Sequence, residues 1–306
     1  MSAAGPDPRF AQANTLFFCV GAQKSGTSWL NRYLRSHPDV HLPARELHYW
    51  AKNLRMRNAA FRRMRSKLRK TPKDQVKQRA FFERARNMLR EIEPDHRSYA
   101  DILFDGYEGQ RAVGEITPAY AGLKRSVFEQ MAALNPNTRF LFLMRDPVAR
   151  LHSSVRMVLA KQKDGAEFDE KDVVAYLKDR MARNKLQGIG ARSRYHRTMA
   201  ELEAAVPPEK VGYFFYEDIF EGQSVDGICD FLGLKPHPAN FEKKVNSGVG
   251  TGSGISPEFV SVAMELTGEV YKRAGKRFGS AVPAKWTKRV ETHKASQGAV
   301  LAKVEG

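Results

Sequence analysis

The chain of 306 residues is 42% hydrophobic and has a mean hydropathy of −0.51, which is typical of a soluble globular protein. No apolar run approaches the roughly 20 residues that a membrane-spanning helix needs, and we see no secretory signal at the N-terminus. The net charge of +17 favours an anionic partner. Two cysteines, Cys19 and Cys229, fit buried thiols in a reducing compartment, so we expect a cytoplasmic protein.

Most of the positive charge lies in one segment. Residues 51–90 contain fifteen lysines and arginines against Asp74 and Glu83 alone, a local net charge of +13. Such a segment raises the local concentration of an anionic partner, although a solvated helix face without a partner has the same composition. Residues 271–306 add nine basic residues, and we expect a solvated or frayed terminus there.

The stretch that organises the chain runs from residue 15 to residue 34, TLFFCVGAQKSGTSWLNRYL. Its first part is an apolar run typical of a strand that is buried on both faces of a parallel sheet. Gly21 and Gly26 then bracket a short turn, and an amphipathic helix follows. A turn of this kind directs backbone N–H groups and the positive end of the helix dipole at one point, which suits a phosphate.

The turn differs from the Walker A loop of ATP- and GTP-binding proteins. The pattern GxxxxGK[ST] requires a lysine after Gly26, where Thr27 stands, and Lys24 lies inside the turn instead. A nucleotide held with a magnesium ion is therefore less favoured. The alternative without any ligand is an ordinary turn, in which glycine, serine and threonine serve steric and capping roles.

Apolar runs and helical patterns alternate along the rest of the chain. We expect strands at residues 40–42, through residue 113, at 139–144 and at 211–216. We expect helices at 51–92 with a break at 71–72, at 124–134, from 147 onward, at 193–205, at 225–232 and at 257–273, with an exposed helical excursion at 161–190. This alternation predicts an α/β fold with a central parallel sheet of about five strands, covered on both faces.

In such folds, ligands bind at the carboxyl ends of the strands. Three polar stretches are expected there, at residues 21–28, 115–120 and 145–153, and one shared site is the simplest interpretation. Arg145 ends an apolar strand, and Ser153 follows two helical turns later, so both side chains reach toward one phosphate. The planar guanidinium group matches phosphate oxygens. The alternative is a structural salt bridge between Arg145 and a neighbouring carboxylate, Asp146 or Glu217.

The sequences GAQKSGTSWL and RDPVARLHSSV together resemble the two signature regions of sulfotransferases that use 3′-phosphoadenosine 5′-phosphosulfate, PAPS. The resemblance extends in order from residue 17 to about residue 231 and includes GEITPAY at 114–120 and YED at 216–218. It implies a P-loop-kinase-like three-layer fold. Residues 15–280 would form a single sulfotransferase domain, between an N-terminal tail at 1–14 and a basic C-terminal tail at 281–306.

The resemblance also implies how PAPS is bound. The first region would hold the 5′-phosphosulfate, and Arg145 with Ser153 would bind the 3′-phosphate. Lys24 would stabilise the departing oxygen, so no metal is expected, and the desulfated nucleotide PAP would be the product. The residues implied for the 5′ end are Gln23, Lys24, Ser25, Gly26, Thr27 and Ser28.

Residues 44–50, ARELHYW, are similar to the KExxFF segment of heparan-sulfate-type sulfotransferases, in which the glutamate deprotonates the acceptor. Glu46 matches that glutamate, while this chain has arginine for the lysine and Tyr-Trp for the two phenylalanines. Small-molecule sulfotransferases use a histidine instead, so His48 is the rival base. Without the resemblance, a surface salt bridge with Arg45 or Arg55 would be the simpler role for Glu46.

The implied reaction is in-line transfer of a sulfuryl group from PAPS to a hydroxyl or amine acceptor, such as a glycan, a glycolipid or another carbohydrate-like substrate. An acidic glycan or an anionic lipid would suit the basic segment, and peripheral membrane contact would follow for a lipid. Residues 243–254 are rich in glycine and would close over the nucleotide or serve as a flexible linker.

Two other classes of function remain as alternatives. One is an ATP-dependent P-loop kinase, against which the displaced Lys24 and the paired Arg145 and Ser153 count. The other is a basic nucleic-acid-binding protein, but the charge is confined to one segment and no nucleic-acid motif is present, so we expect no nucleic-acid partner. The sequence does not predict the acceptor or the oligomeric state.

Overall fold

The computed structural model describes residues 5–43, 46–51, 54–90, 93–164, 166–186, 189–242 and 254–304, without the side chains of 54–56, 191 and 298–304. The predictions for Arg45, for a partner at Arg55 and for most of the glycine-rich segment 243–254 therefore lie outside the described parts. Among the described residues, no helix has the length and apolar character needed to cross a membrane.

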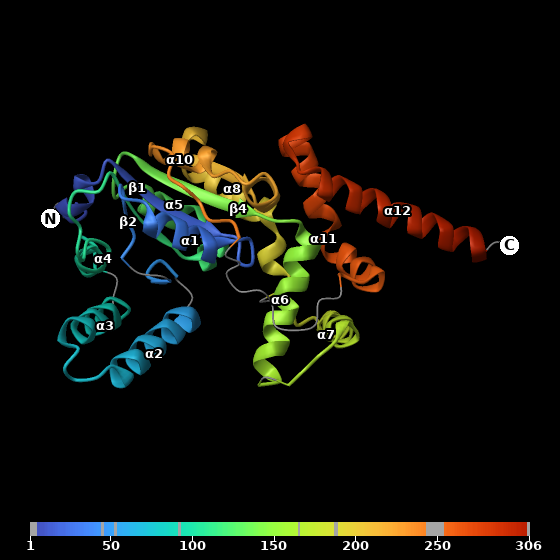
Figure 1. Ribbon diagram of the computed structural model, residues 1–306, viewed down its shortest axis with the longest axis horizontal. Helices are drawn as coiled ribbons and strands as arrows, with labels where there is room; N and C mark the ends of the chain where they lie inside the picture. The colour runs from blue at the N-terminus through green and yellow to red at the C-terminus, as the bar shows by residue number, and fades with distance from the viewer. Residues whose placement is uncertain are drawn as a thin grey trace.

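A five-stranded parallel sheet forms the centre of the molecule, in the order β2-β3-β1-β4-β5. This confirms the predicted α/β fold. Strand β1 lies in the middle of the sheet (Figure 1). The strands are β1 (Thr15–Gly21), β2 (Val40–His41), β3 (Ala112–Ile116), β4 (Thr138–Met144) and β5 (Val211–Phe215).

The side chains of β1 alternate between two hydrophobic cores, because successive residues of a strand point to opposite faces. Leu16, Phe18 and Val20 belong to the core on one face of the sheet, whereas Phe17 and Cys19 belong to the core on the other. Every residue of β1 is buried. The sheet is therefore covered on both faces, as a three-layer fold requires.

Helices of two groups supply these covers. The core that contains Phe17 is completed by α1 (Thr27–Ser36) and α10 (Asp226–Leu232). The core that contains Phe18 is completed by the helices of the other face, among them α4 (Arg97–Leu103), α5 (Arg125–Ala132), α6 (Pro147–Gln162), α7 (Glu170–Ala182), α8 (Tyr195–Ala205) and α11 (Pro257–Phe278).

The basic segment forms two helices, α2 (Leu54–Lys70) and α3 (Val76–Met88), with the break where residues 71–72 predicted it. They lie against each other at one end of the molecule, below the sheet in Figure 1. Ala60 and Met64 face the core, while the opposite face of α2 is exposed and cationic. The side chains on that face are Arg62, Arg63, Arg65, Arg69 and Lys70.

Helices form near both ends of the described chain, where tails were predicted. Residues 8–12 form the 3₁₀ helix η1 (Pro8–Gln12), in which Phe10 is fully buried. The Asn135 side-chain amide donates hydrogen bonds to the carbonyls of Phe10 and Ala13, at 2.7 and 2.9 Å. The 3₁₀ helix η1 therefore packs on the core, although residues 8–12 were predicted to belong to an N-terminal tail.

The predicted C-terminal tail instead contains α12 (Ala284–Val304), which projects from the body of the molecule (Figure 1). Its first turn is anchored by Trp286, which is fully buried among Tyr195, Phe215 and Tyr271. This buried aromatic residue, with ion pairs from Lys285 to Glu221 and from Arg289 to Asp146, holds a helix whose composition is otherwise dominated by polar and charged residues. The remaining short elements are η2 (Pro118–Gly122), η3 (Ala191–Ser193), η4 (Pro208–Lys210), α9 (Tyr216–Phe220) and η5 (Gly279–Ala281).

Candidate functional site

The turn between β1 and α1 has the backbone of an anion-binding loop. Lys24 and Gly26 both adopt left-handed conformations, with φ of 73° and 85°. Gly26 is the N-cap of α1, and since glycine has no side chain it cannot satisfy the first N–H groups of the helix itself. A Cβ atom at Gly26 would lie 2.7 Å from the Phe220 ring, so the close packing of α9 also requires glycine here.

Two polar side chains of the loop are prepared for a ligand. The Ser25 hydroxyl is buried beside the Tyr195 hydroxyl, which itself donates to the Arg145 carbonyl. An anion that accepts the Ser25 proton would add a hydrogen bond to the loop. Burial lowers the pKa of the Lys24 ammonium group, and the nearby Arg145 guanidinium lowers it further. Negative charge from a ligand would offset both effects.

Arg145 lies against this loop, as expected for two strand ends that meet at one edge of a parallel sheet. Its guanidinium donates a hydrogen bond of 3.2 Å to the Lys24 carbonyl and stacks on the Tyr216 ring, 4.5 Å from the ring centre. Ser153 lies two turns further along α6, is half-buried, and makes no hydrogen bond to Arg145 within the described residues. The structure therefore brings Arg145 to the loop, and the role of Ser153 remains a prediction.

Asp146 does not pair with Arg145. Its carboxylate caps α6 at the Ala149 N–H, at 2.7 Å, and accepts hydrogen bonds from Tyr271 at 2.9 Å and from Arg289 of α12 at 2.8 Å. Its own N–H donates to the Glu217 carboxylate at 2.9 Å. The alternative of a structural salt bridge between Arg145 and Asp146 is therefore wrong, and these contacts fix the backbone from which Arg145 extends.

The two candidate bases, Glu46 and His48, lie next to each other. His48 Nε2 is 3.1 Å from a Glu46 carboxylate oxygen, and the side chains are 9% and 27% exposed respectively. Tyr49 and Trp50, which stand where the resemblance has two phenylalanines, are buried in the core, where they pack against Tyr99. The two buried rings anchor the backbone that immediately follows Glu46 and His48.

The third polar stretch at the sheet edge, residues 115–120, interacts with this pair through Glu115. Glu115, at the end of β3, is buried and accepts hydrogen bonds from the hydroxyls of Tyr99 and Thr117. Burial raises the pKa of the Glu115 carboxyl, while these hydrogen bonds and the nearby His48 act in the opposite direction. The stretch at 115–120, which was predicted to contact a ligand, therefore contributes Glu115 and Thr117 to a buried polar cluster with Tyr99 that interacts electrostatically with His48.

Arg192 was not predicted, yet it reaches the centre of this region. It lies in η3, where the excursion at 161–190 returns to the sheet, and its guanidinium donates a hydrogen bond to the side-chain carbonyl of Gln23 in the loop. Burial lowers the pKa of Arg192, and the Glu46 carboxylate counteracts this effect. No sequence pattern marked this arginine, because its position depends on the path of the excursion through space.

Arg150 was also missed, and it holds η3 in place. The side chain is fully buried and donates to the Ser193 hydroxyl at 2.9 Å, the Ser154 hydroxyl at 3.1 Å and the Ile189 carbonyl at 2.7 Å. Burial lowers its pKa to about 10, because all three of these partners are neutral. Arg150 thus connects α6, which begins after Arg145, to the segment that carries Arg192.

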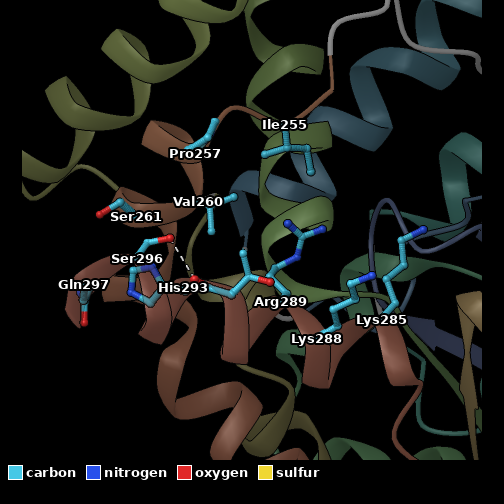
Figure 2. Close-up of a pocket in the computed structure, with 11 residues that line it drawn as sticks. Ile255, Pro257, Val260, Ser261, Lys285, Lys288, Arg289, His293, Ser296 and Gln297 are labelled. Atoms are coloured by element: carbon cyan, nitrogen blue, oxygen red, sulfur yellow. Dashed lines mark hydrogen bonds between the residues drawn. The ribbon is translucent and has the colours of Figure 1, made fainter. Parts of the chain in front are cut away.

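A cavity of about 950 Å³ lies between the start of α11 and α12. Figure 2 shows Lys285, Lys288 and Arg289 along α12, with the Arg289 side chain directed toward Ile255. Two of these cations already have partners, since Lys285 pairs with Glu221 and Arg289 with Asp146. The cavity therefore lies beside the Arg145 strand end but contains none of the predicted site residues.

Cationic side chains from the loop, from the end of β4 and from η3 thus lie at the carboxyl edge of the parallel sheet. No cluster of histidine, cysteine, aspartate and glutamate suited to a metal ion is found among the described residues. A family model described as "Sulfotransferase family" matches residues 17–238. The chain belongs to this family, and the predicted resemblance is confirmed at that level.

Two solved structures support the fold. A sulfotransferase from Alicyclobacillus acidocaldarius is 21% identical, with 90% of this chain and 99% of that chain aligned at a TM-score of 0.59. The sulfotransferase domain from the Synechococcus PCC 7002 olefin synthase is 16% identical, with 87% and 96% aligned at a TM-score of 0.52. A search of curated protein sequences finds no match. The P-loop-kinase-like three-layer fold is thus confirmed, and the chain is a transferase of sulfuryl groups.

Proposed function

We propose that the protein transfers a sulfuryl group from PAPS to a hydroxyl or amine acceptor. The proposal rests on the contact between the Arg145 guanidinium and the Lys24 carbonyl. This contact brings together, at one edge of the sheet, the two sequence motifs that would bind the donor. The Arg145 guanidinium also lowers the pKa of the Lys24 ammonium group, so an anion bound by both side chains would favour both positive charges. The buried Ser25 hydroxyl and the helix terminus at Gly26 suit the same anion.

PAPS fits these residues as a donor substrate. The loop from Gln23 to Ser28 would hold the 5′-phosphosulfate, and Arg145 would bind the 3′-phosphate together with Ser153. In the transfer, an acceptor oxygen or nitrogen bonds to sulfur as the bond from sulfur to the bridging phosphate oxygen breaks, and PAP leaves with that electron pair. Lys24 would stabilise the charge that develops on the departing oxygen. The chemistry proposed here uses no metal.

Glu46 would take the proton of the acceptor. It is the more exposed member of the pair, so an acceptor reaches its carboxylate more readily than it reaches the His48 ring. His48 lies 3.1 Å behind it and would orient the carboxylate, or serve as the base itself if the acceptor binds on the other side. Single substitutions of Glu46 and of His48 would show which of the two side chains is the base.

An acidic acceptor, such as an acidic glycan or an anionic lipid headgroup, would suit the cationic face of α2. This helix begins three residues after Ala51, at the end of the segment that carries Glu46 and His48. The five exposed cations on that face stand opposite the buried side of the helix and would attract an extended polyanion. A cytoplasmic location is part of the proposal, because both cysteines are buried thiols.

Thermal unfolding with added nucleotide tests the donor. PAP, which binds only the folded state, is expected to raise the melting temperature, and the rise should increase with concentration. ATP with magnesium should give a smaller rise, because the loop lacks the lysine that follows the second glycine of a Walker A motif. A clear rise with ATP and magnesium but none with PAP would overturn the proposed donor and favour a kinase.

A further inference from the structure

The residue that follows Arg145 is tied to the two C-terminal helices. The Asp146 carboxylate accepts hydrogen bonds from the Tyr271 hydroxyl of α11 at 2.9 Å and from the Arg289 guanidinium of α12 at 2.8 Å. The Asp146 side chain is 1% exposed and that of Arg289 is 18% exposed. A carboxylate buried this deeply depends on its counter-ion, because removing one partner of a buried ion pair leaves an uncompensated charge.

Trp286 of α12 packs on two tyrosines that hold the same stretch of backbone. Its ring centre lies 5.8 Å from that of Tyr271 and 6.3 Å from that of Tyr195. The Tyr195 hydroxyl donates to the Arg145 carbonyl at 2.8 Å, and the Tyr271 hydroxyl donates to the Asp146 carboxylate. The start of α12 is therefore packed against the groups that hold the end of β4.

These contacts also keep Asp146 from neutralising Arg145. The Asp146 carboxylate, which is the nearest acid in the sequence, is engaged by α6, α11 and α12 instead. The hydrogen bond from the Arg145 guanidinium to the Lys24 carbonyl, at 3.2 Å, uses one of the five N–H donors of an arginine. Arg145 can therefore bind a phosphate without competition from the carboxylate beside it.

We propose that Arg289 is a positioning residue for the 3′-phosphate of the donor, and that the docking of α12 on Asp146 sets the conformation in which Arg145 binds that phosphate. The inference rests on the proposed function, since it requires a 3′-phosphate at Arg145. It assigns a role to residues 281–306, for which the sequence predicted a solvated or frayed tail.

Calorimetric titration of the full chain with PAP and with 5′-AMP tests the inference, because the two ligands differ in the 3′-phosphate. Arg289→Gln should lower the affinity for PAP by about three to ten times, part of the value of one charged hydrogen bond, and leave that for 5′-AMP unchanged. Tyr271→Phe should act in the same direction, since it removes one hydrogen bond to Asp146 and keeps the ring. The matched control is Lys285→Gln, which removes the ion pair from α12 to Glu221 and should change neither affinity.

The ratio of the two affinities separates positioning from folding. A variant that is partly unfolded binds both nucleotides less and in equal proportion, so its ratio stays that of the wild type. In a chain that already carries Arg145→Ala, Arg289→Gln should change the ratio no further, because Arg289 acts through Arg145.

Three results would overturn the inference and leave the proposed function intact. They are an unchanged ratio in Arg289→Gln, an equal fall in Lys285→Gln, and an equal fall with and without Arg145. If Arg289→Gln does not fold, an unchanged ratio in Tyr271→Phe overturns the inference instead. A wild type that binds PAP no more tightly than 5′-AMP would contradict the proposed donor, and the inference with it.

Discussion

Lys24 is the residue whose surroundings best match a role in bond cleavage. It lies in the turn between β1 and α1, where its backbone adopts a left-handed conformation. Burial and Arg145 both make its positive charge costly in the absence of a ligand. A charge held in this way without a counter-ion is stabilised when negative charge develops nearby, which is the condition for electrostatic catalysis.

Replacing Lys24 by alanine should lower the rate of sulfuryl transfer by about 10² to 10³, the usual effect of removing one such donor. Binding of PAP should weaken much less, because the backbone N–H groups of the loop remain. Single-turnover rates and calorimetric PAP titration check the two expectations together, with the exposed Lys161→Ala as control. An unchanged rate constant in Lys24→Ala would contradict the assigned role.

Substitution also separates the two candidate bases. Glu46→Gln should reduce the rate by about two to four powers of ten, the typical contribution of a general base. His48→Asn should reduce it by about tenfold or less if the imidazole only orients the carboxylate. The rate constants at saturating PAPS provide the comparison, and a larger loss in His48→Asn than in Glu46→Gln would assign the base to the histidine.

The sequence predicted those site residues that lie at the ends of strands. Lys24 and Arg145 were predictable as neighbours, because parallel strands end at the same edge of a sheet and the apolar runs before them are clear. Arg192 was not, since it reaches the loop only through the fold of the excursion at 161–190. The burial of Tyr49 and Trp50 was also missed, because Tyr99, on which both pack, is part of the unpredicted helix α4.

At the scale of elements, α2 presents one cationic face and one buried face. Arg57 and Arg79 are tied to backbone carbonyls, at Leu89 and at Thr71, so they stabilise the helix pair. The exposed cations of α2 serve no such purpose in the described contacts. This division within one segment separates arginines that hold the fold from those available to a partner, which the net charge alone could not show.

Replacing Arg62, Arg65 and Arg69 by glutamine should weaken binding of a polysulfated glycan by about tenfold at low salt, from a few tenths of a kcal/mol for each exposed charge. The difference should shrink as salt is raised, because exposed charges are screened. Affinity for heparin, used as the probe, is the measurement. The control variant replaces three exposed cations of α7 and of its C-cap, Lys171, Lys178 and Arg183.

Equal losses in the α2 variant and the α7 variant would indicate attraction by overall charge and contradict a directed surface. Vesicles of anionic lipid, tested with the same variants, distinguish the source of the negative charge. A selective loss with vesicles but not with heparin would replace the glycan by a lipid surface as the partner of α2.

The junction of α6, α7 and α11 carries a pH dependence. His152 Nε2 lies 2.8 Å from the Glu170 carboxylate, which also accepts the Ser256 N–H at the start of α11. Burial lowers the pKa of His152, while Glu170 counteracts this and Arg156 adds to it. A histidine with a lowered folded-state pKa contributes stability that is present above its unfolded pKa of about 6.5 and is lost as pH falls below it.

His152→Gln should therefore reduce the dependence of stability on pH. The wild type is expected to lose melting temperature between pH 7 and pH 5 more steeply than the variant, which has no imidazole to protonate there. Thermal unfolding in buffers across this range is the measurement. Parallel curves for the two proteins would mean that His152 has a similar pKa in the folded and unfolded states.

For the whole molecule, the parallel sheet and its two covers were predictable, since short apolar runs alternate with helical patterns over most of the chain. The ends were not. Trp286 is the fully buried aromatic residue of α12, and one aromatic residue among many charges gives no periodic signal. Likewise η1 is packed through Phe10 and through a hydrogen bond that the Asn135 side-chain amide donates to the Phe10 carbonyl, a contact between distant parts of the chain. The domain limits at residues 15 and 280 were predicted from composition. In the structure, the ends are held to the core by a few buried side chains that composition does not reveal.

The central claim is that this edge of the sheet binds a nucleotide with phosphates on both its 3′ and 5′ sides. Calorimetric titration with PAP and with 5′-AMP tests it most directly, because the two ligands differ only in the 3′-phosphate. PAP should bind the wild type about 10 to 100 times more tightly, the value of a charged hydrogen bond, and Arg145→Ala should abolish most of that difference. Equal affinities for PAP and 5′-AMP in the wild type, or an unchanged ratio in Arg145→Ala, would contradict the account.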